Sequence, residues 1–157
     1  MDGQDVLARI QERGRLYGIN QTRRAVHSVL GVLADLLPTP AFRRLTAHLP
    51  ADVRPPVPSG EGRAIEVLTC RAFITRLASR LHLEEPDAAF LARVIFEQLN
   101  VAAAGTTPAT VAHLVAADLR PLLSAGVPQT RPAAPQYRIR LTVPARPAVR
   151  QAAASAR

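Results

Sequence analysis

The chain has 157 residues, of which 48% are hydrophobic and only 4% aromatic, so an aliphatic core of ordinary size can form. All 20 basic residues are arginine, and with 12 acidic residues they give a net charge of +8. Residues 1–125 hold 14 arginines and all 12 acids, whereas residues 126–157 hold 6 arginines and no acid. The charge therefore belongs mainly to the C-terminal segment, which excludes a strongly basic folded domain.

Apolar residues at spacings of three and four predict three helices in the first third of the chain. The first predicted helix carries the stripe Val6, Ile10, Gly14 and Tyr17. The second has a broad apolar face within 26–37. The third begins at Thr39, with Pro40 at its first position, and stops at Pro50.

Residues 50–62 are rich in proline and glycine and are predicted to form a linker. A fourth helix follows, with the stripe Val67, Cys70, Ile74, Leu77 and Leu81. The acidic run 84–87 suits the positive end of a fifth helix. A sixth helix is expected to begin at Thr107-Pro108.

Two stretches of the chain resemble each other. Thr39-Pro40-Ala41 precedes Ala51-Asp52-Val53-Arg54-Pro55, and Thr107-Pro108-Ala109 precedes Ala117-Asp118-Leu119-Arg120-Pro121. A duplicated segment usually forms two copies of one helical unit that pack together. We therefore predict an all-α domain over residues 1–125, a six-helix bundle of two three-helix copies at about 1–55 and 64–123.

The remainder, 126–157, is predicted to be an extended tail rich in arginine and proline. Residues 137–143 alternate between apolar and polar side chains, which is typical of a strand. Such a strand has no sheet of its own, so it needs a partner protein, a second copy in a homodimer, or a groove on the helices. The predicted partner-binding residues are Tyr137, Arg138, Ile139, Arg140, Leu141 and Val143.

The ordered pattern also resembles a known family. The order of four features is similar to the bacterial domain-of-unknown-function 2267 family. These are a helix that starts with Phe73-Ile74-Thr75-Arg76-Leu77, a following turn, an alanine-rich second helix and the closing Leu49-Pro50. The resemblance covers about residues 5–123. It implies an all-helical fold built from a repeat, and it implies no activity.

Several residues are candidates for chemical sites. His48 and His113 occupy matching places and can either bind a metal together or pack at helix ends. Cys70 is either a nucleophile or, because it lies in an apolar stripe, a buried and inert thiol. Arg54 and Arg120 either form an anion site or close the ends of helices. The sequence has no phosphate-binding glycine loop, nucleophile elbow or zinc-finger spacing, so no catalytic, cofactor-binding or metal-binding residue is predicted.

The single cysteine and the absence of a signal-peptide pattern at the N-terminus indicate a soluble, cytoplasmic protein with no membrane partner. We predict a non-catalytic protein-interaction or assembly module that docks through its helical body and its tail. One alternative is an accessory protein that binds nucleic acid through the arginine-rich tail, which predicts strong salt dependence. Another is a small enzyme whose site the sequence does not reveal.

Overall fold

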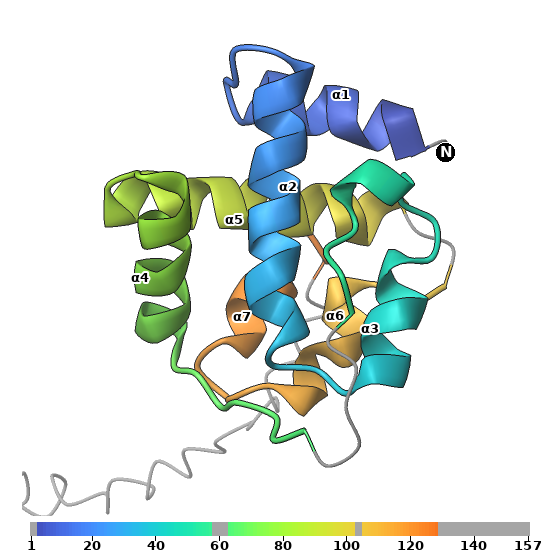
Figure 1. Cartoon of the computed structure of the whole chain (residues 1–157), viewed down its shortest axis with the longest axis vertical. Helices are drawn as coiled ribbons and strands as arrows, with labels where there is room; N and C mark the ends of the chain where they lie inside the picture. The colour runs from blue at the N-terminus through green and yellow to red at the C-terminus, as the bar shows by residue number, and fades with distance from the viewer. Residues whose placement is uncertain (1–2, 58–62, 103–104, 129–157) are drawn as a thin grey trace, which may run out of the picture. The chain divides into compact units, whose positions relative to one another are not determined.

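The computed structural model describes residues 3–57, 63–102 and 105–128, and every regular element in these ranges is a helix (Figure 1). The all-α class predicted from the sequence is therefore confirmed. The strand predicted at 137–143 and the part of the tail after residue 128 lie outside the described residues. None of the described helices combines the length and the apolar character needed to cross a membrane.

The first part of the chain contains α1 (Gly3–Arg13), α2 (Ile19–Ala34), α3 (Thr39–Thr46) and the short 3₁₀-helix η1 (Ala51–Val53). The second part contains α4 (Cys70–Leu81), α5 (Glu85–Ala102), α6 (Pro108–Val111), the 3₁₀-helix η2 (Ala112–Leu114) and α7 (Arg120–Leu123).

The described residues thus contain seven α-helices where the sequence pattern predicts six. The difference lies at the end of the second part. Val111 leaves the helical region (φ −100°, ψ 1°), the chain tightens into η2, and Val115 is extended. Pro121 then occupies the start of a new helix, where its missing N–H leaves no hydrogen bond unmade.

Two predicted apolar stripes extend beyond the helices that the structure contains. Helix α1 ends at Arg13 because Arg15 has a positive φ, and Tyr17, in the loop before the N-cap Gly18 of α2, is 97% exposed. Val67 is 81% exposed because Thr69 caps α4 and the helix begins only at Cys70. In both cases a residue at the correct spacing lies in a loop, since spacing alone does not mark where a helix ends.

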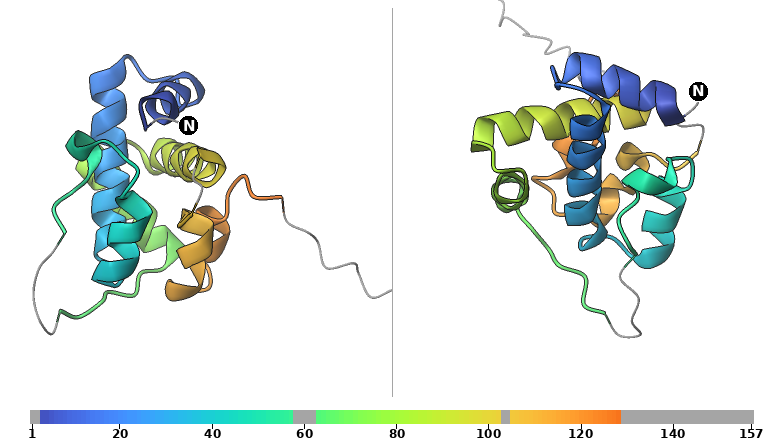
Figure 2. Two further views of the ribbon diagram at one scale, coloured as in Figure 1. Left: turned by 90° about the vertical axis from the view of Figure 1, so that its right-hand side faces the viewer. Right: turned by 45° about the horizontal axis from the view of Figure 1, so that its top comes forward.

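The two longest helices, α2 and α5, carry the core. Helices α1 and α4 each pack against both of them, and the ribbon views show α2 crossing α5 (Figures 1 and 2). Phe73 of α4 and Phe96 of α5 meet with ring centroids 6.0 Å apart, within the usual range for an aromatic pair. Leucine, valine and isoleucine side chains fill most of the remaining core, as the low aromatic content requires.

Candidate functional site

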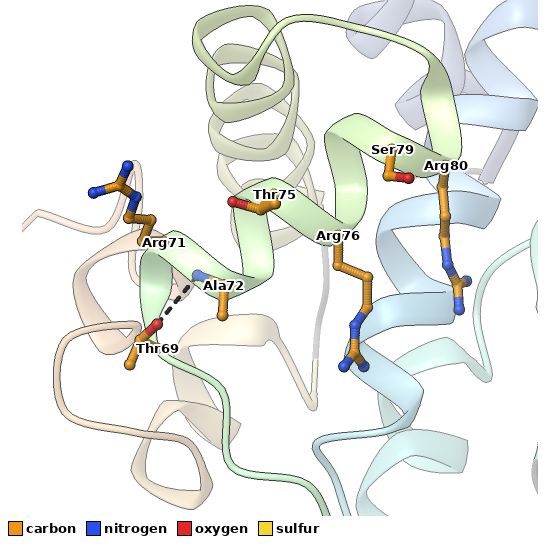
Figure 3. Close-up of a pocket in the computed structure, with 7 residues that line it drawn as sticks. All are labelled: Thr69, Arg71, Ala72, Thr75, Arg76, Ser79 and Arg80. Carbon is orange, nitrogen blue, oxygen red and sulfur yellow. Dashed lines mark hydrogen bonds between the residues drawn. The ribbon is translucent and has the colours of Figure 1, made fainter.

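The candidate site lies on the outward face of α4, where the surface is hollowed into an open groove of about 630 Å³ (Figure 3). Helix α4 uses one face for the core, with Phe73, Ile74 and Leu77 buried against α2 and α5. The opposite face carries short side chains flanked by arginines. The groove is lined by Thr69, Arg71, Ala72, Thr75, Arg76, Ser79 and Arg80.

Local interactions fix both ends of α4. The Thr69 hydroxyl accepts a hydrogen bond from the Ala72 backbone N–H at 3.1 Å, which is a typical N-cap. The Asp118 carboxylate accepts a second one from the Cys70 N–H at 2.9 Å. At the other end His82 adopts a left-handed conformation (φ 54°), and its backbone N–H donates a hydrogen bond to the Ala78 carbonyl. Hydrogen bonds therefore fix both ends of the helix that forms the groove.

Arginines on this side of the molecule converge on Asp35, which follows the last residue of α2. Arg63 lies 3.5 Å, Arg76 3.7 Å and Arg80 4.0 Å from the Asp35 carboxylate. Arg63 also donates to the Ala34 carbonyl at the end of α2, where a cation is favourable. These partly exposed pairs join α4 and the segment before it to α2, and each contributes roughly 0–1 kcal/mol.

Two other carboxylates, Glu66 and Glu85, contact residues that line the groove. Arg76 lies 2.8 Å from Glu66, and the Thr75 hydroxyl donates to Glu85 at 2.8 Å. Arg71 and Ser79, by contrast, have no hydrogen bond or ion pair from their side chains within the described ranges, and both are exposed. The groove therefore offers one unpaired guanidinium and one unpaired hydroxyl above a floor of short side chains.

Arg80 lies unusually close to helix α2. A Cβ atom placed on Gly31 would lie 2.6 Å from Nη1 of Arg80, so the guanidinium lies against the one position of α2 that has no side chain there. The Arg80 side chain is 44% exposed and its ion pair with Asp35 is long, at 4.0 Å. The side chain can therefore move toward a ligand at little cost.

The thiol of Cys70 is not the buried group that its place in an apolar stripe predicts. Cys70 is the first residue of α4 and is only partly buried, because the helix begins at this position and not before it. Burial raises the pKa of the Cys70 thiol above its ordinary value, and the nearby Asp118 carboxylate adds to the rise. A raised pKa disfavours the thiolate, which is the nucleophilic form.

The matched histidines do not form part of a larger ligand cluster. His48 and His113 are both exposed, and the described part of the chain contains no group of three or more His, Cys, Asp or Glu side chains placed to hold a metal ion. Partial burial lowers the pKa of His48, and the charge of Arg54 lowers it further. His113 instead lines a groove beside Arg44.

The two matched arginines close turns. Arg54 donates from Nε to the Leu49 carbonyl at 2.7 Å, and Arg120 donates from Nε to the Val115 carbonyl at 3.3 Å. Each guanidinium is thus bonded to a carbonyl five residues earlier, as the helix-end interpretation predicts. The acidic start of the fifth helix is also confirmed, with Glu85 in the first turn of α5.

The α4 groove is not among the sites predicted from the sequence. Its signal is nevertheless present, since residues 71, 76 and 80 are arginines that flank the face opposite the apolar stripe of the same helix. The six tail residues predicted to bind a partner lie outside the described residues.

Fold and surface define a class: an all-helical domain that presents open grooves between and along its helices. The model of the family described as "Uncharacterized conserved protein (DUF2267)" matches residues 3–122, which is most of the chain. The protein belongs to the DUF2267 family, as the sequence resemblance indicates. None of the curated proteins compared with the chain matches it.

Proposed function

We propose that this protein is a non-catalytic interaction module and that the outward face of α4 is its principal docking surface. The observation that carries this proposal is the exposed, hydrogen-bond-free state of the Arg71 and Ser79 side chains beside the short side chains of Ala72 and Thr75. Short side chains let a partner backbone approach closely, and an arginine in the rim pairs with acidic groups. The expected partner is a protein segment with carboxylates that face Arg71 and Arg80.

The tail is the second docking element of this proposal. Its alternating segment supplies apolar side chains at Tyr137, Ile139, Leu141 and Val143, while Arg138 and Arg140 carry positive charge. An extended segment of this kind can add to the edge of a partner's sheet through its backbone, or pair with a second copy of the chain. The single cysteine is consistent with action in a reducing compartment such as the cytoplasm.

We also propose that the body arose from two copies of one helical unit. Each part of the chain runs through three α-helices and then a 3₁₀-helix, although η1 (Ala51–Val53) matches the turn at 117–119 in the repeat and η2 lies before that turn. Arg54 and Arg120 bond the carbonyl at the same distance along the chain. Under this proposal α4 corresponds to α1, and the candidate docking groove lies on α4.

Affinity capture from a nuclease-treated native lysate tests the docking proposal. The whole chain serves as bait beside Arg71→Glu, and Arg43→Glu is the matched control on the exposed face of α3. Because Arg71 is in the first turn of α4, glutamate there improves the helix-dipole interaction, so we expect the variant to stay folded. We expect Arg71→Glu to lose a discrete protein that Arg43→Glu retains.

The tail is tested in the same assay with the double variant Ile139→Asp, Leu141→Asp, which should also lose that partner. Equal capture by wild type and both charge variants would contradict the role of α4, and unchanged capture by the double variant would contradict the role of the tail.

The six arginines and no acid after residue 125 favour a second candidate function, nucleic-acid binding through the tail. Neutralising several phosphates releases counterions, so such binding weakens steeply with added salt. Captured material that disappears with nuclease, and whose binding falls steeply between about 50 and 200 mM salt, would favour this function over protein docking.

A further inference from the structure

A second groove lies between the two parts of the body, away from α4. It runs between α3 and the α6–η2 segment, which lie side by side in the ribbon views, and it measures about 510 Å³ (Figures 1 and 2). That volume is within the range of roughly 300–1,000 Å³ that small-molecule sites occupy. The residues that line it are Pro38, Pro40, Ala41, Arg44, Thr106, Thr110, Val111, His113 and Leu114.

Most of the lining is aliphatic. Ala41 and Val111 are buried at 7% and 4% exposure and belong to the hydrophobic core, so the groove reaches the core between the two helices. Leu114 is 39% exposed although it is large and apolar, and the ring of Pro38 also lines the groove. An apolar ligand body would remove this surface from water, at roughly 25 cal/mol per Å².

The groove is lined by one arginine, Arg44, and by His113, and no carboxylate is among its lining residues. Arg44 donates from Nε to the Pro40 carbonyl at 3.3 Å, which holds the guanidinium beside the start of α3. Its Nη groups make no ion pair within the described residues, and neither does the His113 ring.

The hydroxyl of Thr110 in the groove is already used. Thr110 forms a capping box with Thr107, in which its hydroxyl donates to the Thr107 carbonyl at 2.8 Å and accepts from the Thr107 N–H at 2.9 Å. The free polar groups are therefore the Thr106 hydroxyl and the donors of Arg44 and His113, at the edge of an aliphatic groove. A planar guanidinium binds a carboxylate through two parallel hydrogen bonds.

We propose that this groove binds an aliphatic monocarboxylate, with the carboxylate on Arg44 and His113 and the hydrocarbon chain against Ala41, Val111 and Leu114. An inorganic anion would leave the aliphatic lining in water, and a neutral lipid would leave Arg44 without its partner. The inference goes beyond the docking role of α4, because it uses other helices and a different ligand, and neither proposal depends on the other.

The test is a titration of the full chain with sodium octanoate, followed by ¹H–¹⁵N chemical shifts of the backbone amides. Octanol serves as the neutral probe of the same chain length, and inorganic phosphate as the anion without an apolar body. We expect saturable shifts with octanoate at Ala41, Thr110 and Leu114. Octanol and phosphate should bind at least about tenfold more weakly, because each lacks one of the two interactions.

Two variants and a matched control locate the site. Arg44→Gln should weaken octanoate binding at least about fivefold, because it removes the charge-assisted contact. Leu114→Asp should abolish binding, because it places a negative charge in the path of the chain. Arg43→Gln removes the neighbouring arginine of α3, which does not line the groove, and should leave the affinity unchanged. The ¹H–¹⁵N spectrum of each variant shows that it is folded.

The proposal is overturned if octanoate and octanol bind equally, since the arginine would then have no role. It is also overturned if no saturable shift appears, or if Arg43→Gln weakens binding as much as Arg44→Gln does. Shifts confined to residues outside the groove would likewise contradict it.

Discussion

The substitution Gly31→Ala tests how Arg80 lies across helix α2. Gly31 is inside α2, where alanine is favoured over glycine by about 1 kcal/mol. Against this gain, the new Cβ would lie 2.6 Å from Nη1 of Arg80, so the guanidinium has to move. Its pair with Asp35 spans 4.0 Å and the side chain is 44% exposed, so moving it costs no more than about 0.5 kcal/mol.

The free energy of unfolding of Gly31→Ala should therefore exceed that of the wild type by about 0.5 kcal/mol. In an Arg80→Gln background the obstacle is shorter, and the same substitution should increase it by nearly the full 1 kcal/mol or so. Urea denaturation of the four proteins measures both increments and the coupling between the two positions.

Gly18→Ala is the matched control for this experiment. Gly18 has a φ of 126°, and a Cβ atom added there would meet no neighbouring side chain or backbone within 4 Å, so alanine strains the backbone without a clash. It should destabilise the protein by about 1 kcal/mol or more. The opposite result would be that Gly31→Ala destabilises the wild type by more than about 1 kcal/mol and is neutral in Arg80→Gln. The Arg80 side chain would then be held rigidly, which refutes the claim that it moves at little cost.

Three further predictions concern single groups. Asp35→Asn removes the anion on which three partly exposed arginines converge. In urea denaturation it should lower the free energy of unfolding by about 1 kcal/mol at low salt and by clearly less in 1 M NaCl. A loss independent of salt would contradict this. Cys70 should react with iodoacetamide more slowly than glutathione does at pH 8, since its pKa is raised, and a faster reaction in the folded protein would contradict the assignment. The pKa of His48 in the folded state is lowered from 6.5, so protonation favours the unfolded state, and stability present above about pH 6.5 is lost as the pH falls below it. His48→Gln should therefore lose less stability than the wild type between pH 8 and 5.5. Parallel plots of unfolding free energy against pH for the two proteins would contradict the lowered pKa.

The sequence predicted the helical class because helices bury residues at a spacing that can be read along the chain. The stripe that includes Phe73, Ile74 and Leu77 is buried in α4 as expected. The helix boundaries were less predictable, since Arg15 adopts a positive φ although arginine is not a residue that marks such a turn. For this reason the spacing wrongly places Tyr17 on the apolar stripe of the first helix, whereas its side chain is exposed.

The two grooves depend on tertiary packing and could not be derived from local patterns. Arg63 meets Asp35 across 28 positions of sequence, and Arg44 and His113 line one groove because α3 packs beside the α6–η2 segment. The turn-closing roles of Arg54 and Arg120, by contrast, involve residues five positions apart and could be predicted from the repeated motif. Local chemistry was therefore predictable, and the convergence of distant side chains was not.

The outward face of α4 is proposed to contact a protein partner, and site-specific photocrosslinking in the native cell tests this most directly. Benzoylphenylalanine is placed at Ser79 in the groove and, as the control, at Arg43 on α3. We expect a discrete, nuclease-resistant crosslinked protein from position 79 that is lost when Arg71→Glu is added, and none from position 43. The same crosslinks from both positions, or none from position 79, would contradict the proposed docking surface.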